Sequence, residues 1–129
     1  MVSVLVVEDD PTLVHAIVRN LTARKYDTVS TGSVAEALAA LQQTRPDVVL
    51  LDIDLPDGSG WDVLRAVRAQ GDAPVAVIVM SALRPNLRLI QEFGCFGMLE
   101  KPFPMESLLR LISESLNHVE GEAPEKVIP

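Results

Sequence analysis

Polar side chains that can do chemistry directly follow several apolar segments of this chain. They are Glu8, Asp9, Asp10, Asp52, Asp54, Ser81 and Lys101. Carboxylate oxygens suit Mg²⁺, which keeps several waters and often also takes phosphate oxygens. A lysine and a hydroxyl opposite such an ion could hold a phosphoryl group during its transfer, and a carboxylate could be the nucleophile. These residue types therefore predict phosphoryl-transfer chemistry, provided that the fold brings them together.

The apolar segments themselves have the length and composition of β-strands. The longer ones are Val2–Val7, Asp47–Leu51 and Val75–Met80, and the shorter ones are Tyr26–Ser30 and Gly97–Leu99. The longer segments are almost continuously apolar, a pattern typical of parallel strands that are covered on both faces. Because the carboxyl ends of parallel strands lie along one edge of their sheet, we expect the polar residues that follow these segments to meet there.

Segments with helical periodicity lie between the predicted strands. Their apolar residues recur three or four positions apart, which indicates helices with one buried face. The predicted helices are Pro11–Arg24, Val34–Gln43, Trp61–Ala69, Pro85–Phe93 and Met105–Asn117. Alternating strands and helices imply right-handed crossovers and a parallel sheet. The predicted fold class is therefore α/β, with an open doubly wound sheet of five parallel strands and helices on both faces.

The composition argues against several classes of protein. The net charge of −7 does not suit direct nucleic-acid binding by this domain. The single cysteine, Cys95, cannot form an internal disulfide and suits a reducing compartment. No apolar stretch reaches the roughly 18 residues that a membrane-spanning helix needs, and the first residues lack the basic region of a signal peptide. We therefore expect a cytoplasmic protein that does not contact a membrane.

The C-terminal residues differ in character from the rest of the chain. Residues 119–129 are acidic and contain a glycine and two prolines, a composition typical of disordered segments. We therefore predict one folded domain over residues 1–118, followed by a disordered tail or the start of a linker over residues 119–129.

Four stretches of the sequence together resemble the receiver domain of two-component response regulators. They are VLVVEDDP, PDVVLLDIDLPDGSGWDVL, VIVMSA and EKPF, and the resemblance extends from Ser3 to about Asn117. It implies a flavodoxin-like strand order, 2-1-3-4-5. It also implies a phospho-accepting signalling switch that uses Mg²⁺, rather than an enzyme that acts on a separate substrate. The expected partner is a sensor histidine kinase or a phosphotransfer protein, which donates the phosphoryl group.

The resemblance assigns roles to the acidic residues. Asp52 falls on the phosphoryl acceptor, and Asp9 falls on a residue that binds Mg²⁺ directly. Glu8 is expected to bind the ion through water, and Asp54 through its backbone carbonyl. The implied metal site is therefore Glu8, Asp9, Asp52 and Asp54, whereas Asp10 is suited to cap the helix that follows it.

The resemblance also identifies the residues of a conformational switch. Ser81 falls on the hydroxyl that hydrogen-bonds the phosphoryl group, Ala82 on the small residue that leaves it room, and Lys101 on the cation that pairs with it. The bond from Lys101 to Pro102 is expected to be cis. Met98 falls where the family usually has Tyr or Phe. The signal is expected to leave through the face built by the fourth and fifth helices and the last strand, by homodimerisation or by effector binding.

Two other functions fit parts of the sequence. A receiver-like binding module could signal by contact without phosphorylation. Met98 and the short interval between Ser81 and Lys101 favour this alternative, whereas the complete set of site residues argues against it. Residues 52–54, DID, also match the Asp-x-Asp motif of haloacid-dehalogenase-type phosphatases, but in those enzymes the motif follows the first strand. The sequence fits both a stand-alone receiver and one part of a longer regulator, and it leaves the effector, the cognate kinase and the oligomeric state open.

Overall fold

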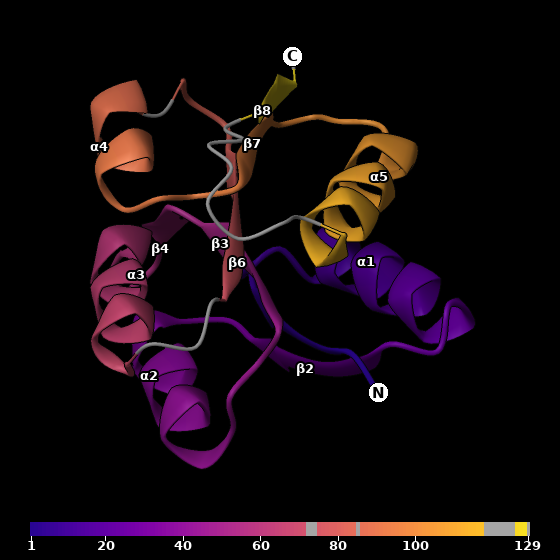
Figure 1. Ribbon diagram of the computed structural model, residues 1–129, viewed down its shortest axis with the longest axis horizontal. Helices are drawn as coiled ribbons and strands as arrows, with labels where there is room; N and C mark the ends of the chain where they lie inside the picture. The colour runs from indigo at the N-terminus through magenta and orange to yellow at the C-terminus, as the bar shows by residue number, and fades with distance from the viewer. Residues whose placement is uncertain (72–74, 85, 118–125, 129) are drawn as a thin grey trace.

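The computed structural model describes residues 1–71, 75–84, 86–117 and 126–128 (Figure 1). Its strands are β1 (Ser3–Val7), β2 (Asp27–Thr31), β3 (Val48–Asp52), β4 (Asp54–Leu55), β5 (Gly58–Ser59), β6 (Ala76–Ser81), β7 (Gly97–Glu100) and β8 (Lys126–Ile128). Its helices are α1 (Pro11–Ala23), α2 (Val34–Gln43), α3 (Gly60–Ala69), α4 (Leu87–Glu92) and α5 (Met105–Leu116). Each predicted strand and helix is present, with ends that differ by a few residues. None of the helices in these ranges has the length and apolar character needed to span a membrane.

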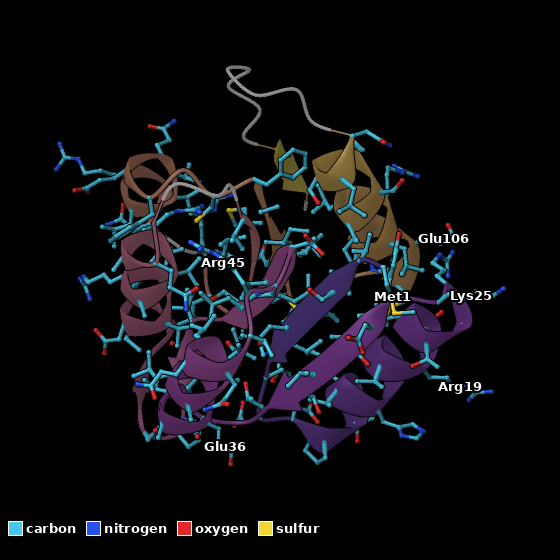
Figure 2. The ribbon with its side chains drawn as sticks, turned by 60° about the horizontal axis from the view of Figure 1, so that its bottom comes forward. Met1, Arg19, Lys25, Glu36, Arg45 and Glu106 are labelled. Atoms are coloured by element: carbon cyan, nitrogen blue, oxygen red, sulfur yellow. The ribbon has the colours of Figure 1, made fainter. Side chains whose placement is uncertain are left out.

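The main sheet has the order β2-β1-β3-β6-β7-β8, with parallel neighbours throughout. Its first five positions correspond to the predicted order 2-1-3-4-5, which is confirmed. Helices α1 and α5 cover one face of the sheet, and α2, α3 and α4 cover the other (Figure 1). Alternate strand residues fill a separate aliphatic core on each side, so that Leu50 packs with α1 and α5 residues whereas Leu51 packs with α2, α3 and α4 residues. Charged side chains such as Arg19 and Lys25 point outward (Figure 2).

Polar side chains cap the first turn of four helices, α1, α2, α3 and α4. The Asp10 carboxylate accepts a hydrogen bond from the Thr12 N–H at 3.0 Å, and α1 then starts with Pro11. Asn86 caps α4 in the same way, and the Ser33 hydroxyl accepts from the Glu36 N–H at the start of α2. The helix α4 has only 6 residues, which is shorter than the predicted range 85–93. The hydrogen bond from the Thr12 N–H confirms the predicted role of Asp10 as a helix cap.

Two short elements were not predicted. Strands β4 and β5 pair antiparallel and form a hairpin directly after β3. Residues 126–128 form β8, which pairs with β7, whereas the sequence predicts a disordered tail or linker from residue 119 onward. This pairing takes up backbone groups at the edge of β7, and the division into a domain over residues 1–118 and a tail over residues 119–129 stays a prediction. The remainder of the predicted tail, residues 119–125 and 129, lies outside the described residues.

Helix α3 is tied to the end of α4 by one arginine. The guanidinium of Arg68 donates to the carbonyl oxygens of Phe93 at 2.7 Å, Val75 at 2.9 Å and Gly94 at 3.0 Å. Burial lowers the pKa of Arg68 from its ordinary value. The Phe93 ring also stacks on Trp61, with 6.1 Å between the ring centroids. These contacts hold the C-terminal end of α4 against α3.

Replacing Arg68 with Met should lower the free energy of unfolding by about 2 kcal/mol, because three backbone carbonyls lose a charged donor. Arg65→Met is the matched control, since Arg65 is largely exposed and contacts Asp62 on the same helix and the Phe93 ring face. That change should cost less than about 1 kcal/mol. Urea unfolding of the two variants measures the difference, and equal losses would show that the three carbonyl contacts add nothing.

Candidate functional site

The carboxyl ends of the central strands bring the predicted site residues together. Glu8 follows β1, Asp52 ends β3, Ser81 ends β6 and Lys101 follows β7. The register fixes their relative positions, because Asp52 lies opposite Met80 and the Lys101 N–H donates to the Ser81 carbonyl at 2.8 Å. The sequence therefore predicts correctly that these four side chains meet at one edge of the sheet.

Three of these polar residues are buried, and two of the three are carboxylates, which are seldom fully buried in proteins. Glu8 is 1% exposed, and Asp52 and Ser81 are each 3% exposed. In contrast, Asp9 and Asp54 are exposed at the rim of the site. A buried carboxylate needs a cation or hydrogen-bond donors to offset the loss of water, and both carboxylates have them.

Lys101 lies between the two buried carboxylates. Its Nζ atom is 2.5 Å from Glu8 Oε1 and 3.2 Å from Asp52 Oδ2. The remaining oxygens accept backbone hydrogen bonds, Glu8 Oε2 from the Asp10 N–H and Asp52 Oδ1 from the Asp54 N–H, both at 3.0 Å. The bond from Lys101 to Pro102 is cis, as expected. One ammonium group thus serves two carboxylates, which leaves the cluster with an excess of negative charge.

Burial and these neighbouring charges shift the pKa values of Glu8 and Lys101. Burial raises the pKa of Glu8 above its ordinary value, and the Asp52 charge adds to this, although the Lys101 ammonium and the Asp10 N–H partly offset the effect. Burial by itself would lower the pKa of Lys101, but the Glu8 and Asp52 carboxylates outweigh burial and raise it. The ammonium form of Lys101 is therefore favoured, and a second cation near Glu8 and Asp52 would relieve their repulsion.

The acidic residues form a cluster that fits a divalent cation. One carboxylate oxygen from each of Glu8, Asp9 and Asp52 lies within 4.8 Å of the others. Oxygen-only donors with an open, water-accessible side suit Mg²⁺ better than softer metals. The Asp54 side chain is exposed and not part of this cluster, and its N–H instead orients Asp52. The cluster therefore fits the cation that the sequence predicts.

The other predicted switch residues lie on β6, on β7 and directly after β6. The Ser81 hydroxyl accepts a hydrogen bond from the Leu83 N–H at 3.2 Å, and Ala82 between them is exposed. Met98 is 4% exposed and packs in the same core as Ile90 of α4. Met98 thus places a buried thioether side chain at the position where receiver domains, which this sequence resembles, usually have an aromatic residue.

One residue close to the site was not singled out from the sequence. Asp57, in the turn between β4 and β5, accepts hydrogen bonds from the Val34 and Ala35 N–H groups at the start of α2. These bonds lower the pKa of Asp57 from its ordinary value. The contact joins positions 22 and 23 residues apart, so no local pattern could indicate it.

Comparison with known proteins identifies the family. The family model described as the response regulator receiver domain matches residues 4–113. The DNA-binding response regulator MtrA of Mycolicibacterium smegmatis is 34% identical over 122 residues, which cover 95% of this chain and 54% of that protein. The transcriptional regulatory protein KdpE of Mycobacterium tuberculosis is 40% identical over 111 residues, which cover 84% of this chain and 48% of that protein. The chain thus spans about half the length of these curated relatives.

Solved structures agree with this assignment. The chemotaxis response regulator CheY4 of Vibrio cholerae is 26% identical and superposes with a TM-score of 0.81, over 89% of this chain and 98% of that one. The sheet order, the buried acidic pair and the lysine before a cis proline are thus found in a chain whose relatives are response regulators. The chain belongs to the family of response regulator receiver domains, the phospho-accepting switches of two-component signalling.

Proposed function

We propose that Asp52 accepts a phosphoryl group from a phosphohistidine of a sensor histidine kinase or a phosphotransfer protein. The observation that supports this most strongly is the environment of the Asp52 carboxylate. It is buried, one oxygen is oriented by the Asp54 N–H, and the other is 3.2 Å from the Lys101 ammonium. A carboxylate in such a setting is held in one orientation with a cation beside it, as in-line attack on phosphorus requires.

In the proposed reaction, an Asp52 oxygen forms a bond to phosphorus as the bond between phosphorus and the histidine nitrogen breaks. Lys101 balances the charge that the phosphoryl group brings to the site, about −1.5 to −2 at neutral pH. The Ser81 hydroxyl is close enough to the same edge to donate a hydrogen bond to a phosphoryl oxygen. Glu8 and Asp9, with Asp52 and the Asp54 carbonyl, would hold Mg²⁺. The bound ion supplies charge neutralisation for the phosphoryl oxygens.

The signal should leave through α4, β7 and α5. Phosphorylation is expected to draw Lys101 from Glu8 toward the phosphoryl group. Because Lys101 directly follows β7, this movement should shift the end of that strand. Because Met98 has no hydroxyl or ring to reorient, the response should consist of repacking against Ile90. Homodimerisation or effector binding through this face is the expected output. The only chemical turnover expected of the domain is its own phosphorylation and dephosphorylation.

The intact mass of the protein after incubation with acetyl phosphate and Mg²⁺ tests this function. The parent should gain the mass of one phosphoryl group, and Asp52→Asn should gain none, because the amide is not a nucleophile. Asp62→Asn is the control, since Asp62 is an exposed α3 residue that pairs with Arg65, and it should behave like the parent. Omission of Mg²⁺ should suppress the gain. A protein that binds Mg²⁺ but gains no phosphoryl group, even from its kinase, would instead be a contact-only module.

A further inference from the structure

The segment after Asp52 folds back on itself and is tied to α2 through one side chain. The hairpin of β4 and β5 closes at its base, where the Gly60 N–H donates to the Ile53 carbonyl at 2.8 Å. At its tip, Asp57 Oδ1 accepts from the Val34 N–H at 2.7 Å and Asp57 Oδ2 accepts from the Ala35 N–H at 3.0 Å. Both carboxylate oxygens are thus engaged by the first turn of α2.

This is a strong attachment for chemical reasons. The first N–H groups of a helix have no partner within the helix, and the helix dipole favours negative charge at that end. A carboxylate that takes two of these N–H groups makes charge-assisted hydrogen bonds, which are stronger than neutral ones. Ser33 caps the same helix through the Glu36 N–H, so α2 has a cap of its own that does not depend on the hairpin.

The residues just before α2 contact the segment that carries Glu8 and Asp9. The Glu8 N–H donates to the Thr31 carbonyl at 3.0 Å, and the Thr31 hydroxyl donates to the Val6 carbonyl. A Cβ atom on Gly32 would lie 3.8 Å from the Glu8 carbonyl oxygen and 3.9 Å from Asp9 Cα. The residues just before α2 therefore lie against the backbone that carries Glu8 and Asp9.

Asp57 thus closes a bridge between the two halves of the acidic cluster. One half is the segment with Glu8 and Asp9, which is held by the residues before α2. The other half is the segment from Asp52 to the hairpin, in which the Asp54 N–H orients the Asp52 carboxylate. We propose that Asp57 is a positioning residue for the Mg²⁺ site, which fixes the spacing of these two halves through its bonds to α2. This inference rests on the proposed function.

The test measures Mg²⁺ affinity by isothermal titration calorimetry in the parent, Asp57→Ala, Asp57→Asn and Ser33→Ala. Loss of a residue that orients metal ligands typically weakens binding, so Asp57→Ala should raise the dissociation constant about tenfold. Asp57→Asn keeps one side-chain oxygen as an acceptor and should lie between Asp57→Ala and the parent. Ser33→Ala removes a cap from the same helix without touching the hairpin, and it should stay within about twofold of the parent.

Amide hydrogen exchange without Mg²⁺ gives a second, independent measure. Residues 53–59 should exchange faster in Asp57→Ala than in the parent and in Ser33→Ala. Unchanged Mg²⁺ affinity in folded Asp57→Ala, or equal weakening in Asp57→Ala and Ser33→Ala, would overturn the proposal. Should Asp57→Ala fail to fold, Asp57→Asn decides by the same criteria. A parent that binds no Mg²⁺ would overturn the metal site itself, and the exchange data would then still show whether Asp57 holds the hairpin.

Discussion

Replacing Lys101 with Met should lower the free energy of unfolding by about 3 kcal/mol at pH 8 and prevent lasting phosphorylation of Asp52. Lys101 is the cation that pairs with both Glu8 and Asp52, whose side chains are 0% and 4% exposed. Without it, two carboxylates share a buried site and repel each other. The phosphoryl group would likewise lack the ammonium that balances its charge.

The loss of stability in Lys101→Met should depend on pH in a defined direction. Burial already raises the pKa of Glu8 above 4.5, and removal of the ammonium raises it further. The folded state then binds a proton that the unfolded state has lost, so stability falls as the pH rises through the raised pKa. In the parent, Lys101 has a raised pKa, so its contribution is complete below pH 10.5 and is lost only as the pH rises above that. The deficit of the variant should therefore be smaller at pH 5 than at pH 8.

Urea unfolding at the two pH values, with EDTA to remove divalent cations, measures this deficit. Lys25→Met is the matched control, because it removes the same charge from an exposed residue that points away from the molecule (Figure 2). The control should change the free energy of unfolding by less than about 0.5 kcal/mol at either pH. A Lys101→Met deficit that is equal at pH 5 and pH 8 would show that the protonation of Glu8 does not govern stability.

Replacing Gly60 with Ala should be the other severe substitution, with a loss of about 3 kcal/mol in the free energy of unfolding. A Cβ atom on Gly60 would overlap the carbonyl oxygen of Asp52 and would lie 2.8 Å from Ile53 Cα. Both are backbone atoms, of Asp52 and of the residue after it, and they cannot move away as a flexible side chain could. The variant should also accept phosphate more slowly, because any relief of the overlap displaces Asp52.

Gly32→Ala is the control for this substitution. A Cβ atom at Gly32 would meet its nearest neighbour at 3.8 Å, an ordinary van der Waals distance. Thermal unfolding should show a clear loss for Gly60→Ala and a change of less than about 0.5 kcal/mol for Gly32→Ala. A Gly60→Ala protein as stable as the parent would mean that α3 can withdraw from the acceptor segment at little cost.

The edge of the sheet where the site lies could be predicted because it follows from strand direction alone. Continuous apolar segments predicted parallel strands, and parallel strands place Glu8, Asp52, Ser81 and Lys101 on one edge whatever their side-chain details. Which oxygen of Asp52 contacts Lys101, and that Glu8 shares this lysine, depends on distances of a few tenths of an ångström. Such distances are set by packing and not by residue type.

Contacts between distant segments could not be predicted from the sequence. Arg68 donates to carbonyls up to 26 residues away, and Asp57 accepts from amides 22 and 23 residues away. Arg68 lies on a helix and Asp57 lies in a turn, where charged residues are usually solvated, so their types gave no signal. The strand β8 was not predicted for a different reason: backbone pairing at a sheet edge depends on an available neighbour, which composition does not encode.

Asp52 is the proposed phosphoryl acceptor among several neighbouring carboxylates, and chemical mapping can identify the residue that carries the phosphoryl group. Borohydride converts an aspartyl phosphate into homoserine, which peptide mass spectrometry locates in the chain after incubation with acetyl phosphate and Mg²⁺. We predict homoserine at position 52, with Asp9 and Asp54 unchanged. Homoserine at position 9 or 54, with Asp52 intact, would contradict the assignment of the acceptor.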